Sequence, residues 1–166
     1  METSQKHYVN KEPHMIDYRI ATKDDINLLM DSRLEALKVV NNLEPDYQFS
    51  PDFTDRSRTY FENGNQTTVL ALMGETVIGC ASICYINIMP TFSHPTGKRA
   101  HLMNVYTNSQ YRRKGVAYHM VNMLIEEAKN RGVTEISLDA TQFGRALYLK
   151  CGFVDSEECM ILTIKN

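Results

Sequence analysis

The stretch QYRRKGVA, residues 110–117, joins an apolar run typical of a strand to an amphipathic run typical of a helix. Its two arginines, lysine and glycine therefore lie where a strand ends and a helix begins. The first N–H groups of a helix have no partner within the helix, and the helix dipole adds partial positive charge there. Gly115 lets the backbone approach a bound anion closely. This junction is therefore predicted to bind phosphate.

The composition indicates one globular domain. The chain has 166 residues, of which 43% are hydrophobic and 23% charged, with a net charge of −2. This charge argues against non-specific nucleic-acid binding, and no apolar run approaches the roughly 20 residues of a membrane helix. Residues 1–16 are polar, lack the apolar core of a signal peptide and are expected to form an N-terminal extension. Four cysteines without a CxxC pair favour free thiols and a cytoplasmic location.

The periodicity of apolar residues predicts an α/β (α+β) domain over residues 17–166. We expect antiparallel strands joined by a tight turn at Gly74 and Glu75, then one parallel strand–helix–strand unit, then further strands. The sheet is therefore expected to be mixed and mostly antiparallel, with about four helices. The predicted strands cover 17–21, 67–73, 76–86, 100–107 and 135–140, and residues 154–164 are expected to form one or two more; the predicted helices cover 22–40, 51–62, 116–130 and 142–150.

Two motifs resemble signatures of the GNAT superfamily of acyl-CoA-dependent N-acyltransferases. Arg112-x-x-Gly115-x-Ala117 is similar to the superfamily motif Q/R-x-x-G-x-G/A. The run ALYLKCGF, residues 146–153, resembles a helix that ends in L-Y-x-K-x-G-F. Both occur in the family's order with a predicted helix and strand between them, so the match is specific. The resemblance implies a GNAT fold and an N-acetyltransferase that moves an acetyl group from acetyl-CoA to a primary amine.

The same resemblance implies where acetyl-CoA binds. The N–H groups of residues 113–118 should hold the diphosphate, and the strand at 104–107 should bind the pantetheine arm. An N–H group near Tyr106 should stabilise the oxyanion that forms when the amine attacks directly, without a covalent enzyme intermediate. Thr141 stands where many relatives have asparagine. The predicted cofactor-binding residues are Val105, Tyr106, Thr107, Arg112, Arg113, Lys114, Gly115, Val116, Ala117, Tyr118 and Thr141.

Two side chains are candidates for proton transfer. Tyr148 matches the family's usual proton donor to the departing thiolate, and a phenol suits that role. His101 opens the central strand where many relatives carry a glutamate base, and an imidazole can do the same work. The alternatives are a tyrosine that only packs in the core and a histidine that caps a strand or pairs with a nearby carboxylate. The basic cluster itself has the alternative of a solvated helix start.

The sequence does not identify the acceptor, which is expected to be a small-molecule amine or a peptide amine. The connection between the first two helices is acidic and aromatic, which suits a cationic amine, although it also fits an ordinary surface loop. Its side chains are Glu44, Asp46, Tyr47, Phe49, Asp52, Phe53 and Asp55. On the other loop, His94, Lys98 and Arg99 could instead meet a carboxylate.

Other functional classes are predicted to be absent or secondary. Cys80, Cys84 and the five histidines show no recurring ligand spacing, so no metal is expected. Neither nucleic acid nor membrane is expected as a partner, and the chain is expected to be a monomer or homodimer. The alternative function is a non-catalytic acyl-CoA-binding or regulatory module on the same fold.

Overall fold

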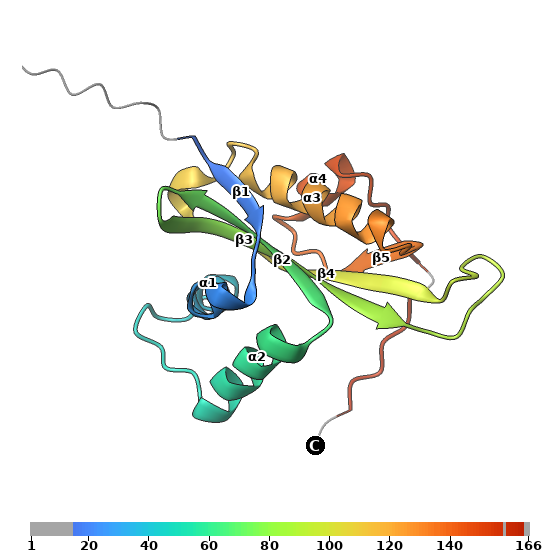
Figure 1. Ribbon diagram of the computed structural model, residues 1–166, viewed down its shortest axis with the longest axis horizontal. Coiled ribbons are helices and arrows are strands. Elements are labelled where there is room, and N and C mark those ends of the chain that lie inside the picture. Colours follow the sequence, from blue (N-terminus) through green and yellow to red (C-terminus); the bar gives the residue numbers. More distant parts are fainter. Residues whose placement is uncertain (1–14, 158, 165–166) are drawn as a thin grey trace, which may run out of the picture.

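The computed structural model describes residues 15–157 and 159–164, which form one five-stranded sheet with helices on both faces (Figure 1). The strands are β1 (Asp17–Ile20), β2 (Gln66–Met73), β3 (Thr76–Asn87), β4 (Lys98–Thr107) and β5 (Glu135–Leu138). The helices are α1 (Ile26–Val40), α2 (Pro51–Asn63), α3 (Val116–Asn130) and α4 (Arg145–Lys150), with 3-10 turns η1 (Lys23–Asp25) and η2 (Ser109–Tyr111). The expected N-terminal extension lies almost wholly outside the described residues.

The strands lie side by side in chain order from β1 to β5. Neighbours from β1 to β4 are antiparallel, whereas β4 and β5 are parallel and are connected through α3. Gly74, with a φ of 60°, lies in the short turn between β2 and β3, as the sequence predicts. The prediction of a mixed, mostly antiparallel sheet with one parallel unit is therefore confirmed.

An apolar cluster packs against each face of the sheet. α3 covers one face, because its apolar residues recur at helical spacing and Met120, Val121 and Leu124 are completely buried. Burial of each such side chain contributes about 1.5–3 kcal/mol. The other face carries a smaller cluster in which Leu29 of α1 packs with Leu70 of β2. Figure 1 shows α3 and α4 on one side of the sheet and α1 and α2 on the other.

The strands predicted within residues 154–164 are wrong for the part that the structure describes. No described residue of this segment belongs to a strand, and Val154, Met160 and Ile161 are at least 80% exposed. Branched and apolar side chains favour strands only when a neighbouring strand supplies hydrogen bonds and a packing surface. In addition, α4 begins at Arg145 rather than near residue 142, and β5 ends at Leu138 rather than at residue 140.

The junction between β1 and α1 depends on a buried carboxylate. Arg19 donates two hydrogen bonds of 2.7 Å to the Asp25 carboxylate, and the backbone N–H of Thr22 donates a third at 2.8 Å. The Arg19 guanidinium and, to a lesser extent, the Thr22 N–H hold the pKa of Asp25 well below its ordinary value, although burial opposes them. This bidentate pair fixes the direction in which the chain enters α1.

We predict that Asp25→Asn lowers the free energy of unfolding by about 2–3 kcal/mol at pH 7, because charge-assisted hydrogen bonds are lost from a buried position. A lowered folded-state pKa stabilises the protein above the unfolded value, which is ordinarily 3.8, and this stabilisation fades as the pH falls through 3.8. Urea denaturation at pH 7 and at about pH 2.5, which lies below 3.8, should therefore show a smaller difference between wild type and variant at the lower pH.

Asp24→Asn is the matched control, because Asp24 lies in the same turn but is exposed. It should change the unfolding free energy by less than about 0.5 kcal/mol. Equal effects of the two substitutions would contradict the role assigned to the Arg19–Asp25 pair.

Candidate active site

The turn before α3 presents free backbone donors. Gly115 precedes the helix with a φ of 81°, and Arg113 has a φ of 59°, which a non-glycine residue rarely adopts. Among the described residues, no protein acceptor receives the backbone N–H groups of residues 113–118. These consecutive donors lie at the positive end of a 15-residue helix. Such a nest suits phosphate oxygens, and it is the junction that the sequence predicts to bind phosphate.

Contacts of Arg112 and Val116 connect this turn to β4 and to the core under α3. Arg112 donates from Nε to the Thr107 carbonyl at 3.0 Å, which ties the turn to the end of β4. Val116 is buried at the start of α3, so it anchors the helix while its N–H group remains free. Lys114 Nζ lies 5.3 Å from the centre of the Tyr111 ring. Arg112 therefore ties the turn to β4, while the backbone N–H groups of residues 113–118 have no acceptor among the described residues.

β4 and β5 separate beside this turn. Their parallel ladder joins Arg99–Leu102 to Glu135–Leu138 and ends there. On its other edge, β4 remains paired with β3 as far as Thr107. The backbone of Val105 to Thr107 therefore has no partner from β5, and an extended ligand could pair with it as a strand does.

A β-bulge lies where the two strands separate. The pairing with β3 shifts between Met103 and Tyr106, and Asn104 has a φ of 55°. Arg33 of α1 donates from Nη1 to Asn104 Oδ1 at 3.1 Å, and Asn104 Nδ2 donates to Ser82 Oγ at 3.3 Å. The bulge is thus held by side chains from α1 and β3.

The sequence does not predict Arg33 as a site residue, and it includes Asn104 only as the first residue of the strand expected to bind the pantetheine arm. Asparagine tolerates a positive φ better than most residues, but this preference alone does not locate a bulge. The spacing of Arg33 could have indicated its position, because it follows Leu29 by four residues and precedes Leu37 by four. A cation therefore stands within the stripe of α1 that helical spacing directs toward the sheet.

Tyr148 lies half-buried on α4 against the same core cluster that Val105 of β4 contacts. Its ring meets Phe153 edge-on at 6.0 Å. Burial raises the pKa of the Tyr148 phenol, with a smaller contribution from Cys151, so the hydroxyl keeps its proton at neutral pH. Thr141 Oγ1 accepts a hydrogen bond from the Gly144 N–H at 3.2 Å, so its hydroxyl supports the turn into α4.

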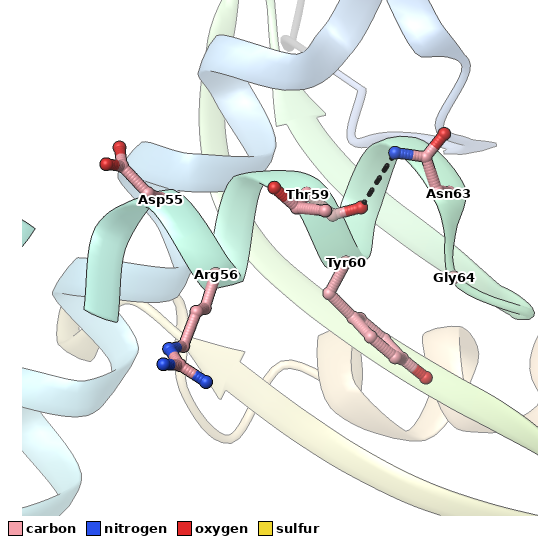
Figure 2. A pocket seen from close by; sticks show the side chains of 6 residues that line it. All are labelled: Asp55, Arg56, Thr59, Tyr60, Asn63 and Gly64. Carbon is pink, nitrogen blue, oxygen red and sulfur yellow. Dashed lines mark hydrogen bonds between the residues drawn. The ribbon is translucent and has the colours of Figure 1, made fainter. Parts of the chain in front are cut away.

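The opposite face of the sheet carries a shallow cavity along α2 of about 440 Å³ (Figure 2). Asp55, Arg56, Thr59, Tyr60, Asn63 and Gly64 line it. Burial and the neighbouring Cys84 of β3 raise the pKa of Tyr60 to about 12. In the connection before this cavity, the Phe49 ring meets those of Tyr47 and Phe53 at 5.0 and 5.4 Å. The aromatic part of the predicted rim therefore gathers into one cluster.

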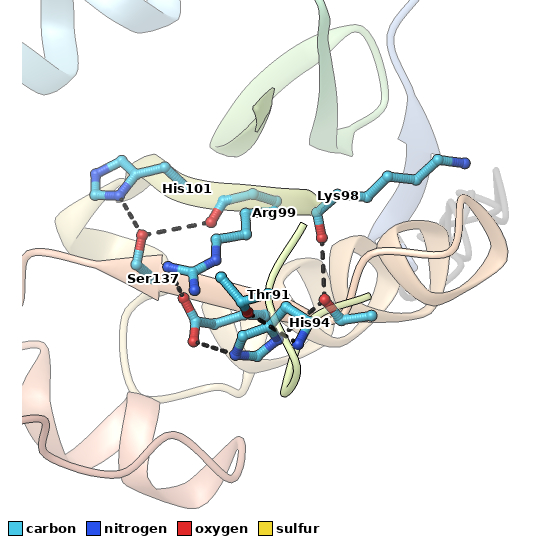
Figure 3. Close-up of polar contacts among 9 residues, drawn as sticks. Thr91, His94, Lys98, Arg99, His101 and Ser137 are labelled. Carbon is cyan, nitrogen blue, oxygen red and sulfur yellow. Dashed lines mark hydrogen bonds and ion pairs between the residues drawn. The ribbon is translucent and has the colours of Figure 1, made fainter. Parts of the chain in front are cut away.

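His101 lies on β4 and contacts Ser137 of β5 (Figure 3) and Asp139, which follows β5. Its Nδ1 is 2.9 Å from Ser137 Oγ, and its Nε2 is 3.7 Å from Asp139 Oδ2. The pairing with a carboxylate agrees with the structural alternative for this residue. It is also the arrangement that orients an imidazole for proton transfer, so it does not separate the two roles.

The basic residues predicted to lie on one loop have partners within the protein, and Lys98 and Arg99 belong to β4 rather than to a loop. His94 Nε2 and Arg99 Nη1 lie 3.1 and 2.8 Å from the Glu135 carboxylate (Figure 3). Lys98 Nζ donates to the Arg131 carbonyl at 3.1 Å. A second cavity of about 470 Å³ adjoins Lys98 and Arg99. Because these side chains already have partners, they are weaker candidates for binding a carboxylate than the sequence alone indicates.

The described part of the chain contains neither a cluster of metal ligands nor a membrane-spanning helix. No group of three or more histidine, cysteine, aspartate or glutamate side chains gathers there as a metal site would require. No described helix is long and apolar enough to span a membrane. The four cysteines are unpaired, and Cys80 is buried.

The chain matches a family model described as "Acetyltransferase (GNAT) family" over residues 34–153. A crystal structure of a predicted acetyltransferase with acetyl-CoA from Clostridium acetobutylicum is 32% identical, with a TM-score of 0.79, and covers 90% of this chain and 96% of that one.

Two curated relatives come from Oryza sativa subsp. japonica. A probable glucosamine 6-phosphate N-acetyltransferase 2 is 39% identical over 59 residues, which are 36% of each chain. Glucosamine 6-phosphate N-acetyltransferase 1 is 27% identical over 132 residues, 76% of this chain and 78% of that one. The chain thus spans only about a third of the first of these relatives.

Proposed function

Because the chain belongs to the acetyltransferase (GNAT) family, we propose that it transfers an acetyl group from acetyl-CoA to a primary amine. The observation that carries this proposal is the set of N–H groups at residues 113–118, which have no acceptor among the described residues. They lie beside the part of β4 after Leu102, which is no longer paired with β5. Together they offer donors for a diphosphate at one end and a free strand edge for the pantetheine arm at the other. The similarity to a structure that contains acetyl-CoA supports this assignment.

The residues then have distinct roles in binding. The N–H groups of Arg113 to Tyr118 hold the diphosphate, while Arg112 keeps the turn against β4. Val105, Tyr106 and Thr107 bind the pantetheine arm through their backbone. Thr107 acts only in this way, because its hydroxyl is buried. Thr141 supports the entry to α4, on which Tyr148 stands.

The chemistry needs one fixed donor and two proton transfers. A backbone N–H near Tyr106 stabilises negative charge on the thioester oxygen as the amine attacks. Tyr148 supplies a proton to the departing thiolate, and its raised pKa keeps that proton available. His101, oriented by Ser137 and Asp139, removes a proton from the amine directly or through water. Holding the two reactants together supplies much of the acceleration.

The acceptor class is the open part of this function. The rice relatives are named for glucosamine 6-phosphate, but one is matched over only 36% of its length and the other is 27% identical. That name therefore does not transfer to this chain. We assign a primary amine and no narrower class on these grounds.

The test is a thiol-release assay with acetyl-CoA and a panel of amines. CoA that appears only when an amine is present supports the transferase. Acetyl-CoA binding with no release across the panel would instead favour a non-catalytic acyl-CoA-binding module. Failure to bind acetyl-CoA at all would contradict both.

We predict that Gly115→Asp weakens acetyl-CoA binding about 100-fold, or about 2.7 kcal/mol. The new carboxylate repels the diphosphate, and the φ of 81° strains any side chain. Gly74→Asp is the control, because Gly74 also has a positive φ with open space around it but lies in the β2–β3 turn. Isothermal titration calorimetry should show normal affinity for the control; undiminished affinity in Gly115→Asp would place the diphosphate elsewhere.

We predict that Tyr148→Phe lowers turnover about 100-fold or more and leaves the KM for acetyl-CoA nearly unchanged. In the wild type, turnover should fall only above the ordinary tyrosine value of 10.0, because burial raises the pKa of this phenol. That alkaline limb should be absent from the variant. Tyr85→Phe removes a comparable half-buried hydroxyl, bonded to Thr67 at 3.0 Å, and serves as control. Full activity of Tyr148→Phe would remove this tyrosine from the mechanism.

We predict that His101→Ala lowers turnover at neutral pH and abolishes the acid limb of the pH–rate profile, because the imidazole must be uncharged to accept a proton. Ser137→Ala keeps the imidazole but removes the 2.9 Å contact, and it should lower turnover less while preserving the limb. If His101→Ala retained the wild-type acid limb, another group would be the base.

A further inference from the structure

Arg33 is a cation placed in an apolar interface. It lies on the stripe of α1 that includes the buried Leu29, and its side chain crosses to the bulge of β4. Long cationic side chains ordinarily reach water when they flank apolar surface. Arg33 is half-buried instead, and burial lowers the pKa of its guanidinium.

No carboxylate pairs with Arg33 among the described residues. Within the described part of the chain, its single hydrogen bond runs from Nη1 to the neutral amide of Asn104 at 3.1 Å. Burial raises the pKa of Cys80 to about 12, so this neighbouring thiol is uncharged at neutral pH. The guanidinium is therefore partly desolvated without a counter-charge, which costs free energy unless a ligand supplies one.

The bulge fixes where this cation lies relative to the proposed reaction centre. Asn104 Nδ2 donates to Ser82 Oγ at 3.3 Å, which turns Oδ1 toward Arg33. Asn104 precedes Tyr106 by two residues, so the two lie within about 7 Å along the strand. Both side chains lie on the α1 face, since Tyr106 packs with the cluster that contains Leu29. The guanidinium is therefore close to where the acceptor amine must stand.

We propose that Arg33 binds an anionic group, a carboxylate or a phosphate, that the acceptor carries a few bonds from its reacting amine. This inference rests on the proposed transferase function and names the acceptor class. A guanidinium has five N–H donors, and Asn104 occupies one of them. The remaining donors form the fork that matches carboxylate and phosphate oxygens.

The same geometry disfavours polyamines. A second ammonium group close to the reacting amine would lie beside Arg33, and like charges in a partly desolvated site repel strongly. The acidic residues between α1 and α2 do not offset this effect, because they are exposed and therefore screened by salt. One of them, Asp52, already pairs with Arg56 at 2.9 Å.

The test compares amines that differ only in the anion. Glycine and the other α-amino acids are compared with their amides, and O-phosphoethanolamine with ethanolamine, by CoA release at saturating acetyl-CoA. Wild type should prefer the anionic member of at least one pair by 100-fold or more in kcat/KM. The amino-acid pairs and the phosphoethanolamine pair distinguish a carboxylate from a phosphate.

Arg33→Met should reduce this preference to 10-fold or less while the KM for acetyl-CoA stays within about twofold. Arg33→Lys keeps the charge but loses the forked set of guanidinium donors. Its preference for the anionic amine should therefore lie between those of wild type and Arg33→Met. Lys129→Met removes an exposed cation of α3 that pairs with Glu126, and it should keep the full preference. A wild type that favours neither member of any pair, or a loss in Arg33→Met that is equal for both members, would overturn the inference while leaving the transferase intact.

A second readout does not depend on turnover. The Nε–Hε NMR signal of Arg33, assigned by its absence from Arg33→Lys, should move when glycine or O-phosphoethanolamine is added and should not move with glycinamide or ethanolamine. If no amine releases CoA, the transferase proposal fails and this signal alone decides whether Arg33 is an anion site. An unmoved signal would overturn the inference.

Discussion

The site depends on backbone hydrogen-bonding groups that the sheet leaves unpaired. Buried or half-buried N–H and C=O groups are costly unless they find partners, and a sheet normally supplies them. Here the parallel ladder of β4 and β5 stops at Leu102 and Leu138, while the chain continues through Thr107 to a turn whose N–H groups also lack partners among residues 15–157 and 159–164. One continuous line of donors and acceptors is thereby available to an extended ligand that ends in phosphates.

The elements that sequence predicts well are those with local causes. The periodicity of α3 and the glycine turn between β2 and β3 come from residues that are neighbours in the chain. The donor turn is also local, because Gly115 and the three basic residues before it directly precede an amphipathic helix. These features were predictable, and the family resemblance adds to them a ligand that the residues alone do not identify.

The features that sequence does not predict depend on distant partners. The bulge at Asn104 exists only in relation to β3, since it is a mismatch between two strands. The position of the Arg33 side chain depends on its contact with Asn104, which lies 71 residues away along the chain. Residues 154–164 have strand-like composition, but composition cannot state whether a neighbouring strand is present. In each case the missing information is tertiary.

The bulge also explains how β4 serves two faces of the sheet at one place. Side chains of a regular strand point alternately to the two faces of the sheet. If β4 were regular, Asn104 and Tyr106 would therefore face α3 as Leu102 does. One extra residue reverses this order. Val105 therefore packs with Leu102 on the α3 face, and Tyr106 packs with Leu29 on the α1 face.

Tyr148 contacts the first of these clusters, and Arg33 reaches the bulge from α1. A group held at this point of β4 consequently has a phenol on the side of α3 and α4 and a cation on the side of α1. Such separation suits the direct transfer that we propose, because the proton donor for the leaving thiolate and the cation that binds the acceptor then lie on different faces of the sheet.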